Sequence, residues 1–206
     1  EVRMGVPVLG VSQDFDRIEV ATDLDVLRAD GVVVAVPMPV LARPGFLVEA
    51  PSSLLEALTR LRMGTAAKVA VATADEPPMF RRQEADYPIW YWTGARPGGS
   101  TRRAVTGFGG TARGAARLVA SAEERIARAV PETSLTGDAI VVDWGADPWT
   151  GGCYSALGPG QRPLLSQLQE PWGRVVFAGE HVNGSGTIDG AIRSGEAAAL
   201  SLLERV

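Results

Sequence analysis

The C-terminal end of the chain combines a buried strand, a glycine-rich loop and a long helix, and this combination constrains the fold most. Residues 175–178 form a short apolar run, and the loop that follows at 179–190 contains four glycines. The alanine- and leucine-rich stretch 191–205 predicts a helix, which we expect to start near Thr187. A helix that follows such a loop leaves backbone N–H groups free, and its dipole favours anionic or electron-rich ligand atoms. The alternative interpretation is a loop that only turns the chain.

A second glycine-rich stretch, Gly107-Phe-Gly-Gly-Thr-Ala112, matches the loose dinucleotide-binding pattern. That pattern requires a strand, a tight turn and an immediate helix. The sequence Ser-Ala-Glu-Glu from Ser121 predicts a capping box and a helix to about Ala129, although residues 112–120 could extend that helix backwards. The sequence therefore does not clearly provide the immediate helix that the pattern requires, and we interpret the match as chance.

The remaining segments predict a mixture of strands and helices. The run 31–36 is β-branched and apolar, as in a strand buried on both faces, and it ends at the prolines of 37–39. Residues 52–62 predict a helix with Ser52 or Ser53 as its N-cap. Further strands are expected at 6–13, 17–22, 26–29, 66–74 and 101–107, with a turn at 14–16 and short strands and loops across 75–100.

Three side chains stand out as candidates for chemistry. Lys68 has only small or apolar neighbours, so its amine interrupts a strand that we expect to be buried; the alternative is a lysine that extends to solvent. Cys153, the only cysteine, follows two glycines that allow a planar ligand to approach the backbone closely. The alternative for Cys153 is a small buried hydrophobe. Glu180 follows the terminal strand and could accept hydrogen bonds from ligand hydroxyl groups.

Composition and charge argue against several classes of function. The 206 residues carry a net charge of −4 without a basic stripe, so nucleic acid is not expected as a partner. No apolar stretch reaches the roughly 20 residues that span a membrane. His181 is the only histidine and no cysteine cluster accompanies it, so we expect no metal site. We expect a cytoplasmic location, because one cysteine fits a reducing compartment and no signal peptide is visible.

Five segments, taken in order, resemble the C-terminal half of the flavin-dependent amine oxidases of the monoamine oxidase type. They are Val6-Pro-Val-Leu9, 29–37, Met63-Gly-Thr-Ala-Ala-Lys68, 144–154, and the pair 177–180 with 186–196. The resemblance implies a mixed α/β fold with two parts. We expect part of a Rossmann-like FAD-binding domain at 1–57 and 147–206, and a mixed-sheet substrate-binding domain at 58–146. The five segments do not include the family's N-terminal dinucleotide-binding βαβ unit, so we expect a partner chain to carry that half.

The resemblance also implies a role for each candidate residue. Lys68 would hold a water molecule against the reactive flavin nitrogen, and Tyr154 would form one wall of an aromatic cage around the amine. Thr187 stands where the family has the second cage tyrosine, and its backbone would stabilise charge on the flavin. The residues expected to contact FAD are Val8, Trp144, Cys153, Gly179, Glu180, Thr187 and Ile188. Many relatives bind flavin without a covalent bond, so covalent attachment through Cys153 and non-covalent binding both stay open.

The resemblance implies the oxidation of a small-molecule amine to an imine, with FAD as cofactor, oxygen as electron acceptor and hydrogen peroxide as product. The alternatives are a non-catalytic structural or binding subunit of a flavoprotein complex, and an amino-acid oxidase of the same fold. A Gly-x-Ser-x-Gly sequence does not occur, which argues against a serine hydrolase.

Overall fold

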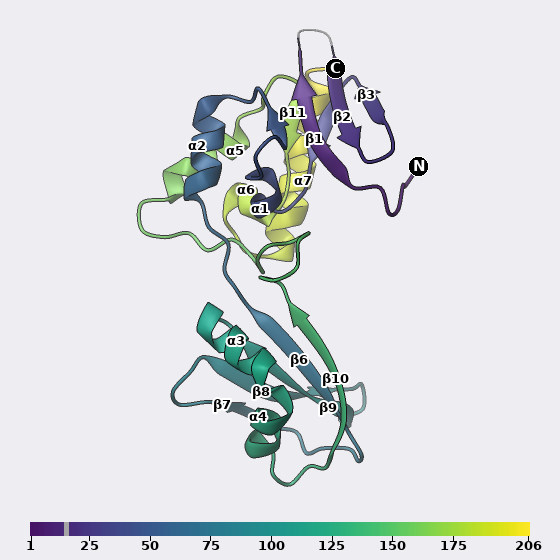
Figure 1. Ribbon diagram of the computed structural model, residues 1–206, viewed down its shortest axis with the longest axis vertical. Coiled ribbons are helices and arrows are strands. Elements are labelled where there is room, and N and C mark those ends of the chain that lie inside the picture. The colour runs from purple at the N-terminus through teal and green to yellow at the C-terminus, as the bar shows by residue number, and fades with distance from the viewer. Residues whose placement is uncertain (15–16) are drawn as a thin grey trace. The chain divides into compact units, whose positions relative to one another are not determined.

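The computed structural model describes residues 1–14 and 17–206, and these residues form two compact units. The first unit combines Glu1–Met63 with Tyr154–Val206, and the second is Gly64–Cys153 (Figure 1). The sequence predicted boundaries after residues 57 and 146, whereas the structure places them after residues 63 and 153. The assignment of the units to FAD binding and substrate binding stays a prediction. The turn expected at 14–16 falls mostly outside the described residues. Each unit is described by itself below.

The first unit holds two small sheets. Strands β1 (Val8–Gln13), β2 (Ile18–Thr22) and β3 (Val26–Ala29) form an antiparallel meander, and β5 (Leu47–Val48) joins β1 in parallel. Strand β4 (Val32–Val34) pairs in parallel with β11 (Val175–Phe177). The crossover from β4 to β11 contains the whole second unit, so residues far apart in the sequence lie side by side in this sheet.

Five helices accompany these sheets in the described part of the first unit. They are α1 (Met38–Leu41), α2 (Ser52–Arg60), α5 (Leu165–Gln169), α6 (Glu180–Asn183) and α7 (Ile188–Leu203), with a 3-10 turn at Arg162–Leu164 before α5. The main core packs apolar side chains of β1, β2 and β11 against α1, α2 and α5. Helix α7 packs on the β4–β11 pair through Ala198 and Leu202, which contact Val176 and Ala178.

Two expectations for the first unit are wrong. The strand at 31–36 was expected to be buried on both faces, but Val33 of β4 is 41% exposed, because β4 has one paired neighbour among the described strands and α7 covers one face. Helix α2 was expected to begin with a serine N-cap. Pro51 occupies the cap position and makes no side-chain bond, and Ser52 is already the first helical residue.

The second unit is a five-stranded antiparallel sheet with two helices on one face (Figure 1). The strands are β6 (Ala67–Thr73), β7 (Arg81–Gln83), β8 (Ile89–Ala95), β9 (Thr101–Gly109) and β10 (Leu135–Asp143), and their order is β10-β6-β9-β8-β7. Helices α3 (Ala112–Ala120) and α4 (Ala122–Ala129) cover the face on which alternate residues are fully buried. This core contains Val69, Val71, Ile89, Tyr91, Val105, Leu118, Ile126 and Val130.

The capping box expected at Ser121 is absent. The Ser121 hydroxyl donates to the carbonyl of Arg117 one turn earlier, at 3.2 Å, and accepts from Arg125 at 3.0 Å. A serine can bond back to the preceding turn instead of capping the next helix. The backbone of Ser121, with φ −149° and ψ 43°, also separates α3 from α4, so residues 112–120 form a helix of their own.

The glycines of the loose dinucleotide pattern have a packing role. Strand β9 does run directly into α3, but it belongs to an antiparallel sheet and not to a βαβ unit. A Cβ at Gly109 would lie 2.6 Å from the backbone of Gly114 and Ala115, so the strand and the helix touch through bare backbone. The stretch therefore serves close helix–sheet packing, as expected for a chance match.

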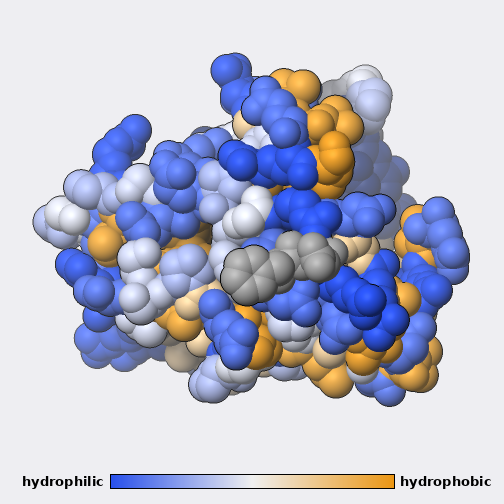
Figure 2. Space-filling model, turned by 90° about the horizontal axis from the view of Figure 1, so that it is seen from above, coloured by the Kyte–Doolittle hydropathy of each residue, from blue (hydrophilic) through white to orange (hydrophobic). Residues whose placement is uncertain are grey.

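Apolar side chains reach the surface among polar ones in several places on the face seen in Figure 2. The exposed fractions include 82% for Ile188 and 58% for Ile192, both in the first half of α7. In the second unit, Ile140 of the edge strand β10 is 71% exposed. No helix among the described residues is long and apolar enough to cross a membrane.

Candidate functional site

The start of helix α7 is built as the sequence predicts. Thr187 is the N-cap, and its hydroxyl accepts from the backbone N–H of Gly190 at 3.1 Å. The carbonyl of Thr187 accepts the first intrahelical bond, from Ala191. Within the described part of the chain the N–H groups of Ile188 and Asp189 find no acceptor. The positive end of a 16-residue helix therefore carries two free donors beside an exposed isoleucine.

Glycine is required at the end of the terminal strand. Gly179 has φ +139°, and a Cβ there would lie 2.5 Å from the Cε1 atom of His181. Its N–H donates to the Ser194 hydroxyl of α7 at 3.1 Å, which ties the loop to the helix. Short helix α6 occupies the following four residues, so the predicted loop is partly helical.

His181 is buried behind Gly179. The side chain is 4% exposed, and its Nε2 atom has no hydrogen-bond partner among the described residues. Burial lowers the pKa of the imidazole, and the neighbouring negative charge of Glu180 opposes that shift in part. The neutral ring therefore serves as packing beneath the loop.

Glu180 holds the segment that bears Tyr154. Its carboxylate accepts from the backbone N–H of Ser155 at 2.8 Å and from the Ser155 hydroxyl at 2.6 Å. Sequence reasoning missed Ser155, because the two residues are 25 positions apart and no local pattern connects them. The neighbouring Tyr154 is 42% exposed, and its Cδ2 atom lies 4.0 Å from the Cβ position of Gly186. An exposed ring thus stands beside the loop that leads to α7.

Val8 lies apart from these residues in the chain, at the start of β1, and is 36% exposed. It therefore offers backbone and an accessible side chain at the end of a strand. Its predicted contact with the adenine part of FAD stays a prediction.

In the second unit, Trp144 and Cys153 are fixed to the segment that precedes β6. The N–H of Trp144 donates to the Ala66 carbonyl at 3.3 Å. The N–H of Cys153 donates to the Gly64 carbonyl at 2.9 Å, and its thiol lies 3.1 Å from the same oxygen. Cys153 is half-buried, so its thiol is neither enclosed in the core nor fully exposed.

The expected burial of Lys68 is wrong. Lys68 is exposed, because β6 alternates and its odd-numbered residues Val69 and Val71 point to the helices. The lysine lies on the opposite face, where its Nζ atom is 5.5 Å from the centre of the Trp92 ring. Alanine and valine fit both faces of this sheet, so the composition around Lys68 does not reveal which face is covered.

The open face around Lys68 is aromatic. Register places Lys68 opposite Phe108, Phe108 opposite Trp90, and Trp92 opposite Arg81. Side chains of β7, β8, β9 and the two residues before β7 line a hollow of 730 Å³; they are Met79, Phe80, Arg81, Trp90, Trp92, Thr93 and Phe108. Sequence reasoning noted the Trp-Tyr-Trp run but did not assign it to a site. The alternation of the two tryptophans around buried Tyr91 is the signal that could have found it.

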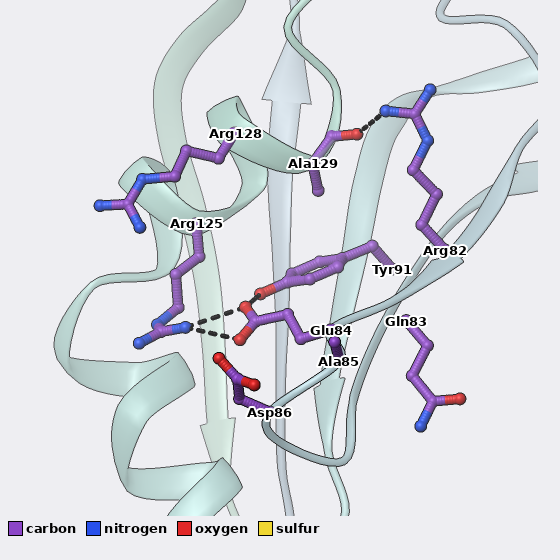
Figure 3. Close-up of a pocket in the computed structure, with 9 residues that line it drawn as sticks. All are labelled: Arg82, Gln83, Glu84, Ala85, Asp86, Tyr91, Arg125, Arg128 and Ala129. Atoms are coloured by element: carbon purple, nitrogen blue, oxygen red, sulfur yellow. Dashed lines mark hydrogen bonds and ion pairs between the residues drawn. The ribbon is translucent and has the colours of Figure 1, made fainter.

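A second hollow, of 340 Å³, lies at the other side of the sheet, between β7, β8 and α4 (Figure 3). The Tyr91 hydroxyl donates to Glu84, and the Glu84 carboxylate accepts from Arg125 at 2.8 and 2.9 Å. Burial, and next the Glu84 carboxylate, raise the pKa of Tyr91. The side chains at its centre satisfy one another's hydrogen-bonding groups, so the arrangement fixes α4 to the sheet.

No group of described residues has the composition of a metal site.

Comparisons with known proteins agree with this architecture. Residues 1–203 match the family described as flavin containing amine oxidoreductase. An L-amino acid dehydrogenase of Synechocystis is 28% identical over 98% of this chain and 46% of its own length, and a nicotine dehydrogenase of Pseudomonas putida is 32% identical over 95% and 41%. The flavin-containing amine oxidase B of Cavia porcellus is 26% identical over 100% and 44%. The chain therefore spans somewhat less than half the length of these relatives.

Solved structures show the same fold. The cyclohexylamine oxidase of Brevibacterium oxydans IH-35A superposes with a TM-score of 0.76 at 22% identity, over 96% of this chain and 48% of that one. A putrescine oxidase gives 0.79 at 22% identity, over 97% and 49%. The predicted mixed α/β class is confirmed. Because the family match extends over nearly the whole chain, this protein belongs to the flavin containing amine oxidoreductase family.

Proposed function

We propose that this chain forms the C-terminal half of an FAD-dependent amine oxidase that converts an amine and oxygen into an imine and hydrogen peroxide. The observation that carries the proposal is the start of α7, where two free N–H groups lie at the positive end of a helix. Exposed Tyr154 stands beside the loop that leads to it. An electron-rich planar group would find donors and an aromatic wall there.

The residues present fit such a cofactor. Gly186, at φ +63°, has its Cβ position 3.9 Å from the Ser155 carbonyl and 4.0 Å from Tyr154, so glycine keeps the turn beside Tyr154 free of a side chain. Ile188 offers an exposed apolar side chain, as the body of a flavin requires. We propose that the cofactor is held by Val8, Trp144, Cys153, Gly179, Glu180, Thr187 and Ile188. When bound, the flavin supplies the two-electron oxidation of the amine carbon.

The chain's own residues then orient the reactants. Tyr154 would place the amine and exclude water, and an aromatic wall disfavours the charged ammonium form, so the neutral amine binds. Lys68 would hold a water molecule by hydrogen bonding. The free N–H groups after Thr187 would stabilise negative charge in the cofactor. Glu180 acts through Ser155, which it bonds twice, and so positions the Tyr154 segment.

The electron acceptor and the substrate need separate assays. Three relatives are named as dehydrogenases, of an L-amino acid, of nicotine and of pseudooxynicotine. We therefore propose to measure hydrogen peroxide and the reduction of an artificial dye side by side, with panels of amines and amino acids. Dye reduction without peroxide would contradict oxygen as the acceptor, and turnover of amino acids alone would support the alternative function.

A further part of the proposal is that a partner chain supplies the other half of the flavin fold. The β4–β11 pair is a parallel sheet of two strands in the described residues, whereas parallel sheets are ordinarily covered on both faces. Purification with identification of co-purifying chains tests this point. A chain that binds FAD stoichiometrically by itself would contradict it.

Acid denaturation of the purified flavoprotein tests the covalent bond. If Cys153 binds the flavin covalently, yellow colour stays with the denatured chain, and the Cys153→Ala variant releases it. Release of all colour from the wild type would refute the covalent bond but leave the amine oxidase proposal intact. A protein that contains its partner and yet binds no flavin at all would refute both and support a structural subunit.

A further inference from the structure

The two edges of the second unit's sheet differ in how they are protected. At one edge, β7 has three residues, and two of them are the exposed arginines Arg81 and Arg82. A short, charged edge strand discourages pairing with another sheet. At the other edge, β10 has nine residues and contains no proline and no basic residue (Figure 1). The sheet is therefore closed to further pairing at β7 and open to it at β10.

The centre of β10 is apolar and exposed. Ile140, Val141 and Val142 are 71%, 47% and 40% exposed, and β6 is the one neighbour of β10 among the described strands. Side chains alternate along a strand, so Ile140 and Val142 lie on the open face with Lys68, and Val141 lies on the opposite face. An edge strand presents backbone N–H and carbonyl groups along its outer side. With aliphatic side chains on both faces, this edge can accept a further strand.

Symmetry and charge identify a second copy of this chain as the occupant. A two-fold axis perpendicular to a sheet pairs residues whose numbers differ by an even amount, because facing side chains must lie on the same face. Asp138 and Asp143 flank the apolar segment, and their numbers differ by an odd amount. When the axis passes through the apolar segment, these two carboxylates therefore never face each other, and the strand does not repel its own copy.

We propose that two copies of this chain pair antiparallel through β10, with the two-fold axis at Ile140. Ile140 then packs against Ile140 of the second copy, as a cross-strand pair. Asp138 faces Val142 of the second copy, and the other neighbour of Val142 is Lys68 on β6. Asp138 and this Lys68 are two strand spacings apart, about 10 Å between their backbones, so opposite charges extend toward each other on one face. The two sheets become one continuous sheet.

The contact does not depend on flavin or on the proposed reaction. It consists of backbone hydrogen bonds between the two strands and of the exposed aliphatic side chains at 140–142 from each copy. Such a contact is smaller than a standard protein interface. We therefore expect a reversible dimer whose population depends on the protein concentration.

Cysteine cross-linking of the purified protein, with any partner chain that it retains, tests the register. Ile140→Cys places two thiols opposite each other, within the Cα separation of about 4.4–6.8 Å that a disulfide needs. Oxidation with copper phenanthroline should then give a dimer on non-reducing gels. Val142→Cys is the matched control, because its thiol lies on the same face but about 13 Å along the strand from its own copy. Native Cys153, present in both variants, gives the background.

Light scattering after gel filtration measures the dimer without cross-linking. Ile140→Lys should weaken the dimer at least about tenfold, because each copy then brings an ammonium group to an apolar contact. Val119→Lys, at an exposed aliphatic position on α3, is the control for the added charge and should leave the dimer unchanged. Hydrogen exchange of the amides at 139–142 should slow when the wild type dimerises.

Three results would overturn the proposal. The first is a wild type that stays monomeric at its highest soluble concentration, and the second is equal cross-linking of Ile140→Cys and Val142→Cys. The third is slow exchange of the amides at 139–142 in a complex that holds one copy of this chain, which would assign the edge to a strand of a partner chain. Flavin binding and amine oxidation are measured separately, so failure of the proposed function leaves these readouts unchanged.

Discussion

Replacement of Gly109 by alanine tests the close packing of β9 on α3, where Gly109 contacts the backbone of Gly114. The new Cβ would lie 2.6 Å from three backbone atoms of residues 114 and 115, whereas carbon contacts normally start near about 3.5 Å. Helix α3 would have to move by roughly 0.9 Å, because backbone atoms cannot rotate out of the way. Its inward side chains, Ala115 and Leu118, are 1% and 0% exposed, so the shift opens contacts in the core.

The cost can be estimated from these terms. Overpacking of a dense core typically costs about 1–3 kcal/mol, and a clash with backbone belongs near the upper end. Removal of a strand glycine returns about 0.5–1 kcal/mol of unfolded-state entropy. We therefore expect Gly109→Ala to lower the free energy of unfolding of the second unit by about 2 kcal/mol.

Urea unfolding, followed by tryptophan fluorescence and by hydrogen exchange of the α3 and β9 amides, measures this loss. Gly94→Ala is the matched control on the same sheet, because its Cβ meets only the flexible Arg102 side chain at 3.2 Å. Its effect should stay within about 1 kcal/mol. Equal stability of the two variants would refute the argument. Loss of nucleotide binding in Gly109→Ala without loss of stability would instead favour the dinucleotide interpretation.

Two further predictions concern titratable groups, one buried and one partly buried. Because burial lowers the pKa of His181, the unfolded state binds the proton more tightly, so the free energy of unfolding should fall as the pH decreases below about 6.5. The slope cannot exceed about 1.4 kcal/mol per pH unit for one proton, and it should be missing in His181→Phe, which removes the only histidine. Parallel urea-unfolding profiles of the two proteins would contradict this prediction. Glu84→Gln should cost about 2 kcal/mol, since it leaves Arg125 without its counter-ion, whereas Glu132→Gln at an exposed ion pair should cost less than about 0.5 kcal/mol. Equal urea midpoints would show that the Glu84 cluster contributes no more than a surface pair.

Sequence motifs predicted a helix start correctly where a bond between neighbouring residues fixes it. The start of α7 at Thr187 was predicted correctly, because the N-cap bond to Gly190 joins residues three positions apart. Ser121 was assigned a capping bond for the same reason and does not make one, since its hydroxyl had a competing acceptor in the preceding turn. Strand β10 was not predicted, although residues 139–142 are apolar and mostly β-branched, and in the fold they pair with β6.

The sequence by itself determined the mixed α/β class and the family to which the chain belongs, and it supplied the candidate site residues, whose roles stay predictions. Tertiary structure decided which side of each element packs in the core and which side stays open. Lys68 lies in a run of small apolar residues that fit either face of a sheet, and only the cover by α3 and α4 assigns it to the open, aromatic side. The Glu180–Ser155 bonds likewise exist only because folding brings distant residues together, since neither residue carries a local signal of its partner.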